Sequence, residues 1–240
     1  MATRFYLPSS GTPPATPAAF SAGWIKTLDA VGPFPAVITP GGTAMTTAVI
    51  NADTGAPEDF VCAGRWVSSA LDAQTIDGSI TGVMRCAELV TDLLDATIAI
   101  AIKVIQPGGA DRGILLATTA SDAPLVGAGT APPEMALTTQ ETRRFQDAAE
   151  SDIITLGSVA AQAGDFLVIE IGMRELLNST TVDGAFRYGD NGGADFAHTD
   201  GLLTDLNPWV EFSGDIAFQV GMTSSPGAVT IPHTFSLFGF

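Results

Sequence analysis

The sequence predicts an all-β protein, an antiparallel two-sheet sandwich of the jelly-roll type with an extended arm at each terminus. Two observations predict this class. Apolar and polar residues alternate with a period of two in many short runs, and segments rich in Gly, Pro, Asn and Asp separate these runs. Sustained helical patterns are almost missing. About eight or nine such strands favour two packed layers.

The composition indicates a globular protein rather than a disordered one. Hydrophobic residues make up 46% of the 240 residues, and charged residues make up 15%. A chain of this length and composition can bury a sizeable core without a disulfide framework or a structural metal.

Three zones follow one another along the chain. Residues 1–42 form a proline-rich N-terminal arm, residues 43–220 the β-sandwich body, and residues 221–240 a C-terminal arm. Within the first arm, Trp24 and the neighbouring Ile25 resemble a short apolar anchor that would dock on the body.

The first strands of the body are predicted at residues 59–71 and 74–89. Strict alternation in the first run places Phe60, Cys62, Gly64 and Trp66 on one face and Val61, Ala63, Arg65 and Val67 on the other. In the second run, Asp77-Gly78 is typical of a tight hairpin turn or of a bulge.

The next two runs, residues 96–105 and 113–120, are expected to form a hairpin around a buried first strand. Residues 121–150 lack a two-residue period and predict a long loop with one helical turn around 138–149. Residues 166–173 are apolar on nearly both faces, which predicts a central strand. The last strands are predicted within residues 182–191 and 207–220.

The formal net charge of −16 excludes non-specific binding to nucleic acid or to anionic membranes, because both partners would repel the protein. The charge serves either solubility or docking onto a basic partner surface. The N-terminus has no apolar region typical of a signal peptide. The longest apolar run is about half the length of a membrane span.

The two cysteines, Cys62 and Cys86, are each expected to be buried as free thiols, because apolar neighbours surround them. One bridge between neighbouring strands remains an alternative, since two cysteines cannot form a disulfide framework.

The sequence contains no catalytic constellation, so we expect a protein that is not an enzyme and that has no catalytic residues and no cofactor. His198 and His233 lie in unrelated segments. Glu170 and Glu211 lie within strands, as a glycan-hydrolysing carboxylate pair would require, but no strand carries two closely spaced acids. Glu170 is expected to pair with Arg85 or Arg174, or to lie at a strand rim.

The acidic loop at residues 188–201 contains Asp190, Asn191, Asp195 and Asp200. Oxygen ligands on a glycine-rich backbone could hold calcium, but the spacing is not that of an EF-hand. A solvated hairpin tip is the preferred interpretation, so no metal site is predicted. Trp66 and Trp209 lie in alternating strands and are expected in the core rather than on a sugar-binding surface.

Four runs resemble a family of structural proteins from tailed bacteriophages and prophages. They are, in chain order, "MATRFYLPSSG", "SVAAQAGDFLVIEIGMR", "FRYGDN" and "NPWVEFS". The resemblance covers residues 1 to about 218 and implies a virion structural component with a β-sandwich body. It implies no activity and supplies no functional residues. The last twenty residues depart from the family pattern, which ends near "NPWVEF".

The arms extend this interpretation on physical grounds. Ordering a residue costs roughly 1–2 kcal/mol of backbone entropy, so an ordered arm must lie on some surface. The side chains expected to contact a partner are Phe5, Tyr6, Leu7, Trp24, Phe235, Leu237, Phe238 and Phe240. The alternative is that both arms fold back on their own sandwich.

The function expected from these observations is that of a capsid decoration or cement protein. Its arms would bind copies of itself, with a trimer as the expected oligomer, and the phage major capsid protein or tail proteins. It would reside in the virion after assembly in the host cytoplasm. The alternatives are a tail, neck or fibre-base structural protein, and a carbohydrate-binding receptor module.

Overall fold

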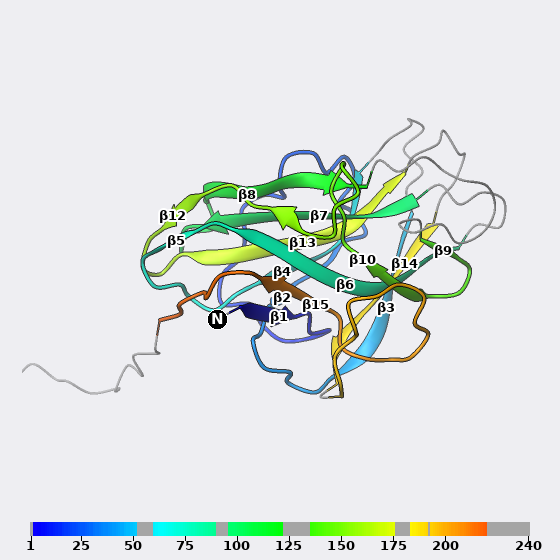
Figure 1. The fold of residues 1–240 in the computed structure, drawn as a ribbon. Helices are drawn as coiled ribbons and strands as arrows, with labels where there is room; N and C mark the ends of the chain where they lie inside the picture. Colours follow the sequence, from blue (N-terminus) through cyan, green and yellow to red (C-terminus); the bar gives the residue numbers. More distant parts are fainter. Residues whose placement is uncertain are drawn as a thin grey trace, which may run out of the picture.

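The computed structural model describes residues 2–51, 60–89, 96–121, 135–175, 183–191 and 193–219 (Figure 1). All secondary structure in these residues is β, and two large sheets pack together as a sandwich. The predicted all-β sandwich class is therefore confirmed. The C-terminal arm, residues 221–240, lies outside the described residues.

Fifteen strands are present in the described part of the chain. They are β1 (Thr3–Tyr6), β2 (Val31–Pro35), β3 (Thr43–Asn51), β4 (Phe60–Val67), β5 (Gln74–Ile76), β6 (Ser79–Glu88), β7 (Ala96–Ile105), β8 (Asp111–Ala120), β9 (Ala136–Leu137), β10 (Glu141–Arg144), β11 (Ile154–Thr155), β12 (Val159–Ala161), β13 (Phe166–Glu175), β14 (Asp183–Asp190) and β15 (Trp209–Phe212).

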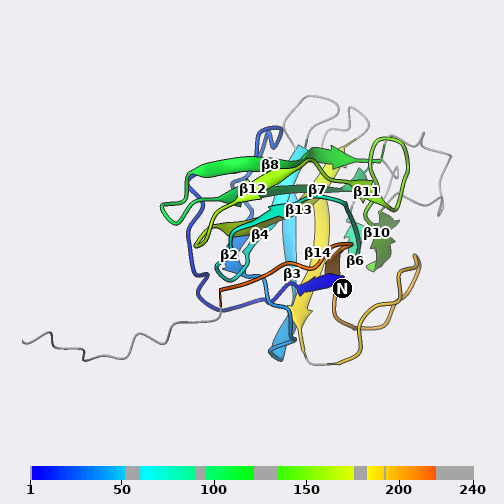
Figure 2. The same cartoon turned by 60° about the vertical axis from the view of Figure 1, so that its left-hand side comes forward.

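The strand order is that of a jelly roll. One sheet contains β3, β14, β6 and β10 in this order, and the other contains β4, β13, β7 and β8. The antiparallel pairs β3–β14, β4–β13, β6–β10 and β7–β8 nest inside one another along the chain, as in a long hairpin rolled into two layers. Figure 2 shows β3 and β14 side by side, running across the direction of β7 and β8.

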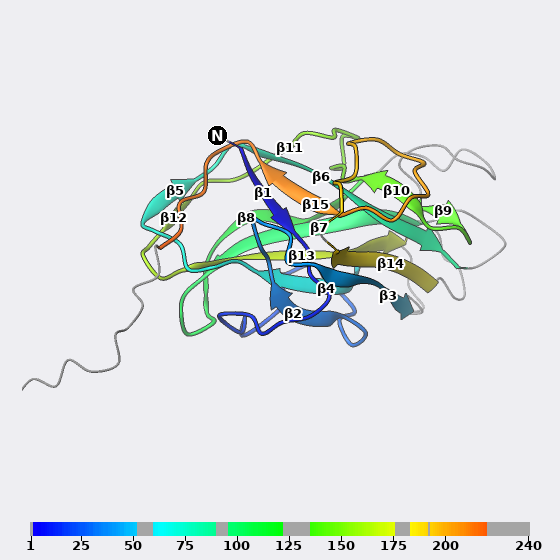
Figure 3. The ribbon, with the colours of Figure 1, turned by 90° about the horizontal axis from the view of Figure 1, so that it is seen from below.

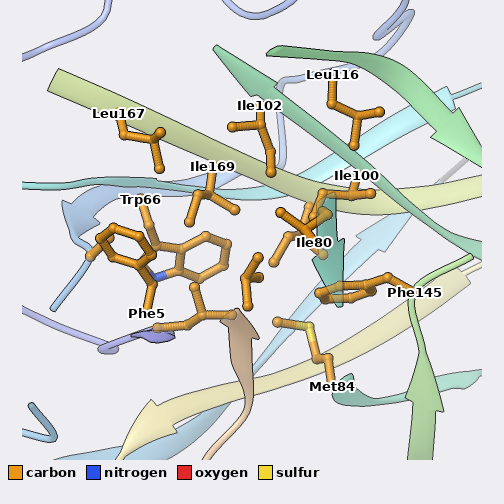
Figure 4. Packing of buried hydrophobic residues seen from close by; sticks show 14 of the residues in the cluster. Phe5, Trp66, Ile80, Met84, Ile100, Ile102, Leu116, Phe145, Leu167 and Ile169 are labelled. Atoms are coloured by element: carbon orange, nitrogen blue, oxygen red, sulfur yellow. The ribbon is translucent and has the colours of Figure 1, made fainter. Parts of the chain in front are cut away.

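The core fills the space between the two sheets (Figure 4). Alternate residues of β7 and β13 point into it, including Ile100, Ile102, Leu167 and Ile169, and each is almost completely buried. Ile80 and Met84 of β6 are buried in the same cluster. The predicted buried strand at 96–105, its hairpin partner and the predicted central strand at 166–173 are thus confirmed, because β13 lies between β4 and β7.

The alternation predicted for the strand at 59–71 is wrong after Ala63. Ile171 of β13 pairs with Gly64, but the next residue, Gly172, pairs with Cys62, so Ala63 is the extra residue of a β-bulge. The bulge shifts the pattern by one position. Val61, Ala63 and Trp66 consequently share the core between the sheets.

Two other local predictions are corrected. Asp77-Gly78 separates β5 from β6, but these strands pair with different partners, so the dipeptide is a corner between sheets and not a hairpin turn. Gly78 has a φ of 91°, which favours glycine there. The helical turn expected around 138–149 is wrong, because Glu141–Arg144 pairs with β6 as β10. Residues 122–134 of the predicted loop lie outside the described residues.

Both cysteines are buried free thiols, as predicted. They lie on strands of different sheets, Cys62 on β4 and Cys86 on β6. Burial raises the pKa of the Cys62 thiol well above its usual range and that of Cys86 to about 12. Both groups are therefore poor nucleophiles at neutral pH.

An ion pair between the buried Asp165 and the partly exposed Arg112 fixes the turn that precedes the central strand β13. Arg112 donates from Nε to Oδ2 of Asp165 at 2.7 Å and from Nη2 to Oδ1 at 3.0 Å. Burial alone would raise the pKa of Asp165, but the hydrogen bonds from Arg112 and from the Gln162 amide, together with the Arg112 charge, lower it. The pair ties the start of β8 to the start of β13.

We expect Asp165→Asn to lower the free energy of unfolding by about 2 kcal/mol at neutral pH. Because the folded-state pKa of Asp165 is depressed, its contribution is present above the unfolded-state pKa of about 4 and is lost as the pH falls through the folded-state value. The variant should thus lose less stability than the wild type between pH 5 and pH 2. Urea denaturation across this range, with the exposed Asp72→Asn as control, measures the difference. Parallel pH profiles for the two proteins would contradict the assignment.

Candidate functional site

The N-terminal residues are part of the sandwich and not a free arm. Strand β1 pairs antiparallel with β15, with Thr3 opposite Phe212 and Tyr6 opposite Trp209 (Figure 3). Tyr6 also bridges to Val37, and Leu7 bridges to Gly189. Residues 3–7 thus form one edge of this sheet.

Four of the residues expected to contact a partner are therefore buried in their own chain. Phe5 and Leu7 have no exposed surface, and Tyr6 and Trp24 are 9% exposed. The prediction that these four side chains bind a partner is wrong for this structure, and the fold-back alternative holds for the N-terminal zone. The composition of the N-terminal zone indicates that some surface must cover its apolar side chains, but it does not indicate whether that surface belongs to the same chain or to a partner. The four C-terminal residues proposed for the same role, Phe235, Leu237, Phe238 and Phe240, lie outside the described residues.

Residues 15–30, here called the N-terminal strap, cross the outer face of the β4-β13-β7-β8 sheet (Figure 2). The Ala18 amide donates to Gly109 O at 2.9 Å, the Ile25 amide donates to Phe60 O at 2.8 Å, and Thr118 Oγ1 donates to Ala22 O at 2.8 Å. The strap is thus attached to β4, to β8 and to the β7–β8 turn.

Trp24 is the apolar anchor of the strap, as predicted, but its neighbour is not. The indole packs against a set of small buried residues on the outer face, Cys62, Ala99, Ala101 and Ala120. The short side chains of these residues leave room for the indole ring, and larger side chains at these positions would fill that space. Ile25 is 62% exposed and contributes no comparable contact.

Three buried charged side chains lie beneath the strap, one on each of the three adjacent strands β4, β13 and β7. Glu170 Oε2 accepts hydrogen bonds from the Ser21 amide at 2.9 Å and from Trp24 Nε1 at 2.8 Å. Arg65 Nη1 and Lys103 Nζ both donate to Ala19 O, at 3.2 and 2.8 Å. The buried charges bind the backbone of the strap, so the strap is specified by polar contacts as well as by packing.

The position expected for Glu170 is wrong. It lies on the central strand and is completely buried, and it accepts hydrogen bonds from Ser21 and Trp24 of the strap rather than from Arg85 or Arg174. Glu211 lies on the other sheet, where Arg4 binds it at 2.9 Å. The two acids therefore do not form a carboxylate pair across a cleft.

The opposite charges in this cluster lie close to one another and stabilise a single arrangement of its side chains. Burial lowers the pKa of Arg65, and the nearby Glu170 carboxylate raises it in part. Lys103 Nζ also lies 2.8 Å from Asp111 Oδ1, so each basic side chain has an acidic neighbour. Such a network holds a segment in place, and the charges stay compensated while the strap covers them.

A second polar cluster joins β1 to the acidic loop. Arg4 Nη1 lies 2.6 Å from Asp195 Oδ2, and the guanidinium stacks over the ring of Trp209 at 4.0 Å. The Tyr6 hydroxyl donates to the same Asp195 oxygen at 2.9 Å. Trp66 and Trp209 are 2% and 3% exposed, which confirms that both belong to the interior.

The oxygen atoms of the acidic loop point to separate partners. Asp190 Oδ2 accepts from the Gly41 amide at 2.6 Å, Asn191 Oδ1 accepts from the Gly193 amide at 2.9 Å, and Asp200 binds Arg144. Within the described ranges no group of three or more acidic, histidine or cysteine side chains is arranged to hold a metal ion. Burial lowers the pKa of His198 in the same loop.

The surface of the described residues has shallow hollows. One of about 230 Å³ is lined by Ser79, Ile80, Thr81, Ile153, Glu211 and Ser213. Another of about 140 Å³ lies beside the last described residues, Phe218 and Gln219. The first has hydroxyl groups and one carboxylate but no aromatic ring among its lining residues, so it lacks the stacking surface typical of a sugar site.

The sequence patterns did not lead us to predict the network of buried charges under the strap. Its signal was present, because Lys103 interrupts the most apolar strand and Arg65 interrupts another. A charge inside such a run indicates a buried partner. It does not indicate that the partner is the backbone of a segment far away in the sequence.

Comparison with protein-family models finds no match for this chain, and comparison with curated proteins finds no significant relative. None of the described residues belongs to a helix that could span a lipid bilayer.

Proposed function

We propose that this protein is a structural, non-enzymatic component of a bacteriophage virion, and most concretely a decoration or cement protein of the head. In this role, many copies bind the shell built by the major capsid protein and stabilise it through numerous small contacts. The C-terminal arm provides the principal contact with the particle.

The observation that carries the proposal is that the four phage-like runs contact one another through the N-terminal segment. Residues Thr3–Tyr6 of the first run pair with Trp209–Phe212 of the last, and Leu7 bridges to Gly189 of the third. Glu170 of the second run binds the strap. The resembling runs are thus joined through contacts of the N-terminal segment, and they are not scattered surface positions.

The N-terminal zone indicates that the two arms have different roles. Its apolar side chains are used within the chain, so they stabilise the body. The C-terminal segment contains four large apolar residues near its end and no Asp, Glu, Lys or Arg. Such a segment gains free energy when a partner covers it.

We expect deletion of residues 221–240 to leave a folded body that no longer binds the phage particle. The described strands end at Phe212, so the deletion removes none of their pairings. Cosedimentation with particles that lack the protein would measure binding, and circular dichroism would measure folding. Bound protein should fall at least tenfold.

Substitutions within residues 221–240 distinguish the effect of losing the segment's length from the effect of losing its apolar side chains. Replacing Phe235, Leu237, Phe238 and Phe240 by serine should abolish binding as the deletion does. Replacing Thr223 and Ser225 by alanine should leave binding unchanged. Full binding by the truncated protein would refute the role of the C-terminal arm.

A further inference from the structure

Strand β3 has one unpaired edge. It pairs with β14 on one side, and among the described residues no strand pairs with its other side (Figure 2). A bulge disturbs the pairing near Thr43, but the register is regular from Thr46 to Asn51. This stretch is long enough to accept another strand.

Hydrogen bonds at the end of β3 show which backbone groups face outward. The Asn51 amide donates to Asp29 Oδ2 at 3.4 Å, and Lys26 Nζ donates to Asn51 O. Because outward and inward groups alternate along an antiparallel strand, the amide and carbonyl groups of Val49 and Thr47 face the same way. The unpaired edge therefore offers the amide and carbonyl groups of Thr47 and Val49, since those of Asn51 already bind Asp29 and Lys26.

This edge lacks the usual protection against other strands. Exposed edges normally carry charged residues or proline, or are very short. β3 has nine residues with neither a charged side chain nor a proline. Val49, on the strand itself, is 55% exposed. Leu28, next to Asp29, which binds the Asn51 amide, is 89% exposed.

Charge identifies the segment that fits this edge. In a chain with a net charge of −16, residues 30–52, which include β3, carry no Asp, Glu, Lys or Arg. Residues 216–240 carry none either. Pairing these two stretches between copies brings no two carboxylates together, whereas other contacts between two acidic molecules would be repulsive. Residues 228–231, "AVTI", are also rich in residues that favour strands.

The C-terminal segment is long enough to reach a neighbouring copy. The Gln219 amide donates to Ala70 O at 2.9 Å, and the described chain ends on the side of the sandwich away from β3 (Figures 1 and 3). The 21 residues from 220 to 240 can extend about 70 Å, which is enough to reach an adjacent molecule.

We propose that residues 228–231 of one copy add as a strand to the unpaired edge of β3 in the next copy. The inference rests on the proposed structural role of the C-terminal arm and assigns its acceptor. Each copy donates one segment and accepts one, so the contact is head-to-tail, and it forms a ring where the rotation between neighbouring copies closes. A ring of three copies would agree with the expected trimer.

Val49→Pro in the full chain tests the acceptor. Proline removes an amide that faces away from β14, so the pairing within the sheet is kept while strand addition is blocked. Val49→Thr is the matched control, since threonine has a similar shape and favours strands. Sedimentation equilibrium should show the wild type and Val49→Thr as oligomers, and Val49→Pro near the monomer mass of 24.6 kDa. Circular dichroism would show whether Val49→Pro is folded.

A disulfide trap provides the second measurement and decides the matter if Val49→Pro is misfolded. Val49→Cys in one copy is mixed with a second copy that carries a cysteine at one of positions 228–231. A cross-linked dimer is expected for at least one position, and the buried Cys62 and Cys86 should not compete. An oligomer that survives in folded Val49→Pro, a monomeric wild type, or no cross-link at any position would overturn the inference. Loss of particle binding by the truncated protein would still support the proposed function in those cases.

Discussion

Gly172→Ala is expected to destabilise the protein by about 3 kcal/mol or more, because the position admits no side chain. A Cβ at Gly172 would lie 1.9 Å from Val61 O and 2.8 Å from Cys62 Cα. Both contacts are with the backbone of β4, which cannot rotate away as a side chain could. The bulge at Ala63 brings this backbone close to β13. Alanine at 172 would therefore force the two central strands apart.

Thermal or urea denaturation measures this effect, and Gly108→Ala is the matched control. Gly108 lies in the exposed β7–β8 turn, and an added Cβ there meets nothing within 4 Å. Its stability should change by less than about 0.5 kcal/mol. Equal stability of the two variants would contradict the bulge geometry.

Trp24→Ala is expected to cost about 3–5 kcal/mol and to release the N-terminal strap. The substitution removes the indole from its site among Ala99, Ala101 and Ala120, and it removes one of the donors to Glu170. The carboxylate then remains beneath a strap that no longer covers it fully. Limited proteolysis should cut within residues 15–30 of the variant much faster than in the wild type.

Ile25→Ala is the control for this experiment, because Ile25 is the next residue and its side chain is mostly exposed. It should change stability by less than about 0.5 kcal/mol and leave the proteolysis rate unchanged. Similar proteolysis of the two variants would show that Trp24 does not anchor the strap.

The sequence predicted the elements whose pattern depends only on burial. The run at 96–105 and the central strand at 166–173 are apolar on nearly both faces, which is what a strand in the middle of a covered sheet requires. The faces of β4 were wrong because one extra residue, Ala63, inverts the alternation, and no local signal distinguishes such a bulge from a regular strand.

The candidate site was only partly predictable. Trp24 was correctly identified as an anchor, since an isolated tryptophan in a Pro/Ala segment requires a covering surface. That this surface belongs to the same chain depends on contacts between residues up to 149 positions apart, such as Ser21 with Glu170. The pattern of apolar and polar residues within a short stretch of sequence does not reveal such long-range contacts. The short strand β10 was missed for the same reason, because β6 stabilises it rather than its own sequence.

The copy number of the protein in purified virions tests the central claim most directly. Quantitative mass spectrometry against the major capsid protein should give a ratio near one copy per capsid subunit, or a simple fraction such as one third. A few copies per hundred capsid subunits would assign the protein to the tail or neck instead of the head. Absence from virions would contradict the structural role altogether.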